Sequence, residues 1–240
     1  MASSQSFEVA WGGNWNRAHR ARWHGVAEQV TGFVATFTED EEIEVHKPKR
    51  FTFCKRRPNS LSEGICEGPS NISIAVNIHR LARGEALRAR FDQLNTGLHE
   101  AIHALRYERF PAEAGEDIDY PEHATHEGLA YVGCILAFRP STSPSTVRQL
   151  AHCVQSLDRR AQFLTPDTFA RNVDTMINDR HRAERSGHWM ASRRCEQGLA
   201  ESMGIIGVST LIDGGIRFAD ILNMPAPDML MTAADVMRST

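Results

Sequence analysis

The sequence predicts an α+β fold that is mostly helical and has a small β-sheet in its N-terminal part. Between residues 43 and 78, apolar and polar residues alternate in short runs, which is the two-residue period of half-buried strands. From residue 81 onward, apolar residues recur every three to four positions, which is the period of amphipathic helices. The 240 residues are 41 % hydrophobic, which is enough for a substantial core.

At this length the chain forms one large domain or two small ones. We expect an N-terminal part, residues 1–140, that contains a long helix, the sheet and the helices with the chemically active side chains. We expect residues 141–240 to form a helical part that packs on it within one continuous domain. The segment 139–145, rich in Pro, Ser and Thr, marks the change between the two parts.

The first elements follow from local patterns. Residues 1–5 predict a disordered start. Residues 15–37 carry apolar side chains at helical spacing, which predicts one long helix with Asn14 as its N-cap. Short alternating runs predict strands at residues 43–45 and 51–54. Around these strands, basic residues form a patch that we interpret as the charged outer faces and turns of a small sheet. The patch comprises Lys47, Lys49, Arg50, Lys55, Arg56 and Arg57.

Local patterns also predict the elements from residue 59 onward. Segment 59–71, rich in Gly, Ser, Pro and Asn, predicts a loop, and residues 72–78 then alternate strictly and give the clearest strand. Gly204, Gly207, Gly214 and Gly215 are interpreted as marking the ends of the late helices. The expected helices span residues 81–110, 122–138, 146–157, 166–177, 187–203 and 209–222.

One stretch of the helix at 81–110 carries metal-binding chemistry, because residues 99–103 read His-Glu-Ala-Ile-His. His99 and His103 are four residues apart, so both imidazoles leave the same face of a helix. This separation suits two ring nitrogens that bind one ion at about 2.0–2.1 Å. Glu100 lies about 100° round the helix from His99, where it can take a proton from a metal-bound water. The pattern predicts a catalytic zinc site.

A catalytic zinc ion takes three protein ligands and keeps one position open for water. The third ligand is expected in the helix at 122–138, and we favour Glu127, because its helical face continues through apolar residues and so points inward. His126 is about 100° away on the same turn and is the alternative ligand. His123 lies one turn before Glu127 on the same face and is a candidate hydrogen-bonding partner for it.

These residues resemble a known family. The motif His99-Glu100-x-x-His103, followed by His126-Glu127-Gly128-Leu129-Ala130, is similar to the gluzincins, and among them to bacterial zinc-dependent proteases described as a domain of unknown function. The resemblance covers roughly residues 71–204. It implies a zincin-like domain with an active-site helix, zinc ligands at His99, His103 and Glu127, and Glu100 as general base. The chain departs from the family pattern at His188, where an aromatic hydroxyl is common.

The function that we expect is therefore a zinc metallopeptidase that hydrolyses a peptide or protein substrate through a metal-activated water. Its tetrahedral oxyanion needs a further hydrogen-bond donor. His188 is our choice, and His181 and Tyr131 are the other candidates. In many zincins a strand beside the site pairs with the extended substrate, a role that we assign as a hypothesis to the strand at 72–78.

Two other classes of function compete with this interpretation. The first is a non-catalytic protein-binding or regulatory module with a structural or vestigial metal site. The second is a helical scaffold that binds no metal. A His₂Glu site also binds several divalent ions, so metal availability decides which one is held.

The composition of the chain limits the partners and the cellular compartment that we expect. The net charge of −3 provides no basic surplus for general nucleic-acid binding. The five cysteines form no Cys-x-x-Cys pair, which fits a reduced intracellular protein, with a Cys54–Cys66 disulfide as the alternative. The sequence shows no signal-peptide pattern and no apolar run near the roughly 18 residues of a membrane span. We therefore expect a cytoplasmic protein without membrane or nucleic-acid partners.

Overall fold

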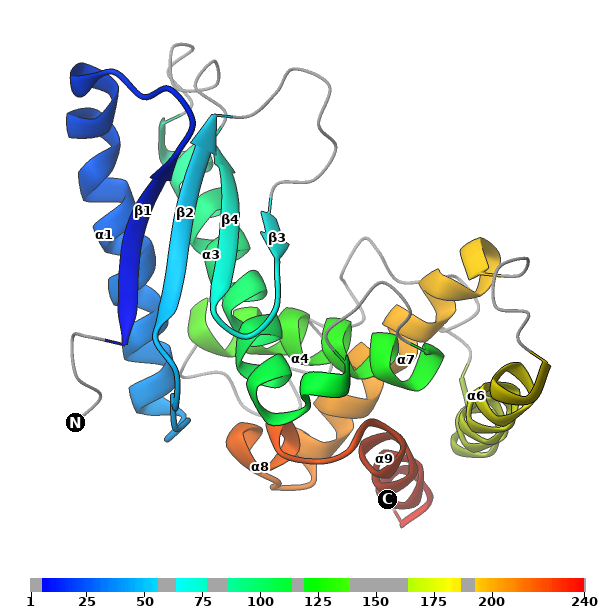
Figure 1. The fold of residues 1–240 in the computed structure, drawn as a ribbon. Helices are drawn as coiled ribbons and strands as arrows, with labels where there is room; N and C mark the ends of the chain where they lie inside the picture. The colour runs from blue at the N-terminus through cyan, green and yellow to red at the C-terminus, as the bar shows by residue number, and fades with distance from the viewer. Residues whose placement is uncertain are drawn as a thin grey trace. The chain divides into compact units, whose positions relative to one another are not determined.

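The computed structural model describes residues 6–55, 64–76, 86–113, 119–138, 164–186 and 193–239. The chain divides into two compact units, Met1–Ala114 and Gly115–Thr240, so the boundary expected at residue 140 falls inside the second unit. A small sheet in the first unit and a mostly helical remainder confirm the predicted α+β class (Figure 1). The expected disordered start and the helix at 146–157 lie outside the described residues.

The sheet of the N-terminal unit has four strands in the order β1-β2-β4-β3 (Figure 1). β1 (Phe7–Gly12), β2 (Lys49–Lys55) and β4 (Asn71–Val76) are parallel neighbours, and β3 (Gly64–Cys66) is antiparallel to β4. The strand predicted at 51–54 is confirmed as β2, and the one predicted at 72–78 is confirmed as β4 up to Val76, beyond which residues 77 and 78 lie outside the described residues. β1 was not expected, and β3 lies inside the segment predicted as loop.

Two long helices cover the sheet. α1 (Arg17–Asp40) and α3 (Ala86–Arg109) contact each other, and Figure 1 shows both behind the strands. Gly97 lies at their junction, because a Cβ atom there would collide with Val30 of α1 and lie 3.3 Å from Ile74 Cδ1 of β4. The apolar side chains of the central strands β2 and β4 are buried, namely Phe51, Phe53, Ile72, Ile74 and Val76. The absence of a side chain at position 97 therefore lets the proposed metal-binding helix pack closely against α1 and the sheet.

The prediction of a strand at 43–45 is wrong, because this segment follows the capped end of α1 and forms no strand. The amide of Ile43 donates to Thr38 O and that of Glu42 to Glu39 O, and Glu42 has a left-handed φ of 55°. These are the two hydrogen bonds of a Schellman motif, so Ile43 is the buried residue that follows the cap. The helix start also differs, since Asn16 rather than Asn14 caps α1 by accepting from the His19 amide at 2.8 Å.

The interpretation of the basic patch as an outer charged face is wrong for Lys49, which is fully buried. Its Nζ donates to Glu108 Oε2 of α3 at 2.8 Å and to Lys47 O at 3.0 Å. Burial lowers the pKa of Lys49, although the neighbouring Glu108 opposes this effect. The pair joins the start of β2 to the end of α3. Arg56 and Arg57 of the same patch lie outside the described residues.

The described part of the C-terminal unit is helical. It comprises α4 (Tyr120–Phe138), α6 (Pro166–Ser186), α7 (Arg193–Asp213), α8 (Phe218–Leu222) and α9 (Ala226–Ser239). The helices predicted at 122–138 and 166–177 are confirmed, α6 running on to Ser186. The prediction that Gly204 and Gly207 end a helix is wrong, because α7 runs through both of them.

The close crossing of α4 and α7 gives the reason for Gly204. A Cβ atom at Gly204 would collide with the carbonyl oxygen of Ala124, and one at Gly128 would collide with the backbone of Gly204. The two helix backbones therefore touch at this point, which only glycine permits. The short helix η1 (Pro111–Glu113) closes the N-terminal unit, where Glu113 accepts two hydrogen bonds from the buried Arg106 at 2.7 and 2.8 Å.

Candidate metal centre

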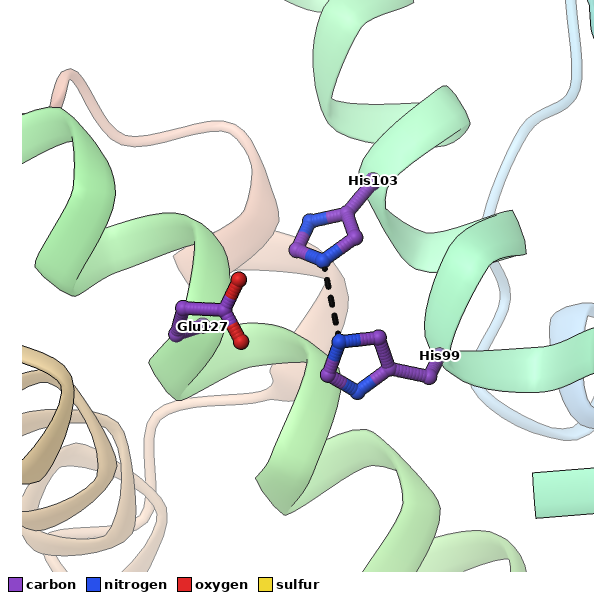
Figure 2. A group of neighbouring side chains, drawn as sticks. All are labelled: His99, His103 and Glu127. Atoms are coloured by element: carbon purple, nitrogen blue, oxygen red, sulfur yellow. Dashed lines mark hydrogen bonds between the residues drawn. The ribbon is translucent and has the colours of Figure 1, made fainter. Parts of the chain in front are cut away.

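The two predicted histidine ligands lie on one face of α3 and meet there. His99 Nε2 and His103 Nε2 are 3.1 Å apart, and the rings are nearly perpendicular at 83° (Figure 2). The helix is fixed in this rotation, because Leu98, Ile102 and Leu105 on its apolar stripe are fully buried. The prediction that both imidazoles share one face is therefore confirmed.

The separation of the two nitrogens permits a test of whether they fit one metal ion. Two nitrogens bound tetrahedrally to one zinc ion, each about 2.0–2.1 Å away, are about 3.3–3.4 Å apart. The observed 3.1 Å between His99 Nε2 and His103 Nε2 differs from this by a few tenths of an ångström. His103 is 8 % exposed and stacks on Tyr107, one turn further along, with ring centroids 6.5 Å apart. The pair therefore fits a shared ion with little rearrangement.

Glu100 points towards strand β3. A Cβ atom placed at Gly64 would lie 2.6 Å from Glu100 Cγ and 2.8 Å from its Oε1. The same atom would lie 2.6 Å from Thr96 Cγ2, one turn earlier on α3. Glu100 is half-buried, so its carboxylate is neither locked in the core nor fully solvated. Glu100 directly follows His99 on α3, and its half-buried carboxylate stays our prediction for the general base.

Cys66 lies near the same carboxylate. Burial raises the pKa of the Cys66 thiol above its ordinary value, and the negative charge of Glu100 raises it further. The thiol donates to Gly68 O at 3.2 Å. Cys54 and Cys66 are both free thiols, so the alternative of a disulfide between them is wrong.

Over Ile72–Ile74, the strand predicted to pair with an extended substrate has neighbours on both sides. β4, which corresponds to the prediction at 72–78, is hydrogen-bonded to β2 on one side and to β3 on the other. Within the described sheet, the strand at this end is β3. The assignment of a substrate-pairing edge is therefore wrong for Ile72–Ile74, and residues 77 and 78 lie outside the described residues.

The third-ligand candidates lie on the first turns of α4, in the C-terminal unit. Glu127 is half-buried, whereas His126 is 1 % exposed. His123 Nε2 lies 3.2 Å from Glu201 Oε1 of α7, an ion pair when the imidazole is protonated. That His123 also supports Glu127 stays a prediction. Gly128, next to Glu127, is placed by its contact with α7.

The structure describes only part of the set of oxyanion donors expected from the sequence. His188 lies outside the described residues, and so does the side chain of His181. Tyr131 lies on α4, one turn after Glu127, and is half-buried. The assignment of His188 therefore stays a prediction.

Three residues near these side chains were missed by sequence reasoning. Gly64 and Cys66 belong to a three-residue strand in a Gly- and Ser-rich segment, where no periodicity can be recognised. Glu201 lies on α7, 78 residues after its partner His123. No local pattern in the sequence links two residues so far apart.

Comparisons with protein-family models, with curated proteins and with solved structures found no match to this chain. Within the described residues, no helix combines the length and the apolar character needed to cross a lipid bilayer. The case for a function therefore depends on the side chains themselves.

Proposed function

We propose that the chain is a zinc-dependent metallopeptidase of the gluzincin type, in which His99, His103 and Glu127 hold the ion and Glu100 is the general base. The observation that carries the proposal is the 3.1 Å approach of the two imidazole nitrogens. His99, His103 and Glu127 are residues of the types that each offer one ligand atom to a metal ion (Figure 2). The resemblance of both motifs to the gluzincins supports the same choice.

The chemistry of the donor set supports a catalytic rather than a purely structural ion. Two neutral imidazoles and one carboxylate are a ligand set of zinc hydrolases, whereas structural zinc sites are mostly rich in cysteine. Such a set carries one negative charge, so Zn²⁺ bound to it keeps a net positive charge. When bound, zinc acidifies a water molecule towards a pKa near 7 and polarises a carbonyl oxygen.

In this proposal, side chains of the chain accept and donate the protons of the reaction. Glu100 is adjacent to His99 but does not share its face, so it can accept a proton from the activated water. The same carboxyl group can deliver that proton to the departing amine of the peptide. His188 is the residue that we propose to donate a hydrogen bond to the oxyanion. The free thiols Cys54, Cys66 and Cys134 fit a reducing compartment, and we propose a cytoplasmic location.

Metal removal and return test the proposed function. Protein purified without added zinc is analysed for bound metal, and its hydrolysis of an unfolded protein substrate is followed by release of new amino termini. We expect about one zinc ion per chain, loss of hydrolysis after chelation and recovery when zinc is returned. Protein that binds no metal, and that gains no hydrolysis when zinc is added, would rule out both the peptidase and the structural-metal alternative.

A further inference from the structure

We propose that Gly64 is a positioning residue for Glu100. Because glycine has no side chain, the Glu100 side chain can occupy the space next to this strand position. The inference rests on the proposed function in so far as Glu100 is its general base. The contact between the two residues does not depend on that function, and it can be tested without metal or substrate.

The contact arises from the way β3 packs on α3. Gly64 pairs with Ile74 of β4 in the antiparallel register, which brings the strand across the helix turn that carries Thr96 and Glu100. A Cβ atom at Gly64 would lie 2.6 Å from both Thr96 Cγ2 and Glu100 Cγ. Ordinary contacts between carbon atoms are about 3.5–4.0 Å. The backbone of Gly64 therefore occupies the space beside Glu100 without any room for a side chain.

The two atoms nearest to such a Cβ atom, Glu100 Cγ and Thr96 Cγ2, cannot easily move away. Glu100 Cγ is placed by the χ1 angle alone, so it can move away only if χ1 changes rotamer or the backbone shifts. Thr96 is β-branched, and its χ1 is restricted in a helix. A methyl group at position 64 would therefore turn the Glu100 side chain, and a change of χ1 moves its carboxylate to another position.

Cys66, two residues after Gly64 on β3, also lies near Glu100. Residues two apart on a strand point to the same side, so Cys66 lies on the side of β3 where a Gly64 side chain would stand. Ile65 between them points the other way and is 51 % exposed. The negative charge of Glu100 contributes to the raised pKa of the Cys66 thiol. The side of β3 that carries Gly64 and Cys66 thus forms a wall beside the carboxylate.

The kinetic test uses Gly64→Ala, with Gly25→Ala as the matched control. A Cβ atom at Gly25 meets nothing within 4 Å, so the control adds the same methyl group in open space. For Gly64→Ala we expect kcat to fall by about 10- to 100-fold with unchanged bound zinc and little change in KM, because a displacement of about 1 Å can cost this much. A kcat equal to that of the Gly25→Ala control would overturn the proposal.

A stability cycle in zinc-free protein tests the contact itself. All variants carry Thr96→Ser, which removes the second crowded methyl group. We expect Gly64→Ala to shift the folding equilibrium towards the unfolded state by about 10-fold when Glu100 is present, and by less than about 3-fold in combination with Glu100→Ala. Equal shifts in both backgrounds would overturn the proposal, and so would failure of Glu100→Ala to restore folding if Gly64→Ala does not fold.

The two measurements separate the inference from the proposed function. A coupled stability cycle in a protein that hydrolyses nothing with zinc bound would leave Gly64 as the residue that places Glu100, and would reject the peptidase. Hydrolysis by the wild type with no coupling in the cycle would reject the role of Gly64 and keep the peptidase.

Discussion

Replacement of Glu100 by Gln is expected to lower turnover by about 10²- to 10⁴-fold, the range over which a positioned general base contributes to catalysis. The amide has nearly the same shape as the carboxylate but cannot accept the proton. Because Glu100 is not one of the proposed metal ligands, zinc content should remain at about one ion per chain. The measurement is the rate of peptide hydrolysis per bound zinc ion, with the metal content of each preparation determined in parallel.

The control for this variant is Glu28→Gln, which makes the same chemical change at a side chain that is 63 % exposed on α1. Its rate should equal that of the wild type. A Glu100→Gln protein with the full rate would mean that Glu100 does not move the proton. If the wild type holds zinc and hydrolyses nothing, and Glu100→Gln keeps the protein's other interactions, the binding-module alternative is favoured instead.

Truncation of Glu108 to Ala is expected to cost about 3–5 kcal/mol of unfolding free energy, because it leaves the charge of Lys49 buried without its partner. Lys49 is fully buried and the Glu108 side chain is 2 % exposed, so solvent cannot replace the lost interaction. Burial lowers the pKa of Lys49 even with Glu108 present, because the charged form loses its contact with water. The measurement is denaturant unfolding at neutral pH.

Two further variants show whether the loss comes from the buried charge. Glu8 forms an exposed cross-strand pair with Arg50 in the same unit, at 3.6 Å, and Glu8→Ala should cost less than about 1 kcal/mol. The double variant Lys49→Met with Glu108→Leu removes both charges and should recover most of the lost stability. A loss for Glu108→Ala no larger than that for Glu8→Ala would show that the pair contributes little.

The parts of the fold that sequence reasoning predicted are those set by local periodicity. The alternation around Ile72 and Ile74 gives β4, and the spacing of Leu98, Ile102 and Leu105 gives α3 and the shared face of its two histidines. A four-residue spacing on a regular helix places both Cα–Cβ bonds on the same face. The histidine pair could therefore be predicted from five consecutive residues.

Most features of the fold that sequence reasoning missed depend on contacts between distant segments. Gly204 looks like a helix end, but it is a crossing point whose meaning depends on the carbonyl of Ala124, 80 positions earlier. Lys49 resembles a surface lysine until the end of α3 places Glu108 beside it. Ile43 alternates like a strand residue, although the two amides after α1 close a helix cap. Tertiary contacts override the local pattern at Gly204 and Lys49, whereas at Ile43 a local helix cap does so.

The most direct test of the central claim is the zinc affinity of four proteins, measured by competition with a chromogenic chelator. They are the wild type, His103→Ala, Glu127→Ala and the surface control His24→Ala, whose side chain is 59 % exposed. We predict one tight site in the wild type and the control, and a loss of affinity of more than about 100-fold in the other two, since even partners of metal ligands contribute 10- to 100-fold. Zinc bound by Glu127→Ala as tightly as by the wild type would contradict the proposed metal centre.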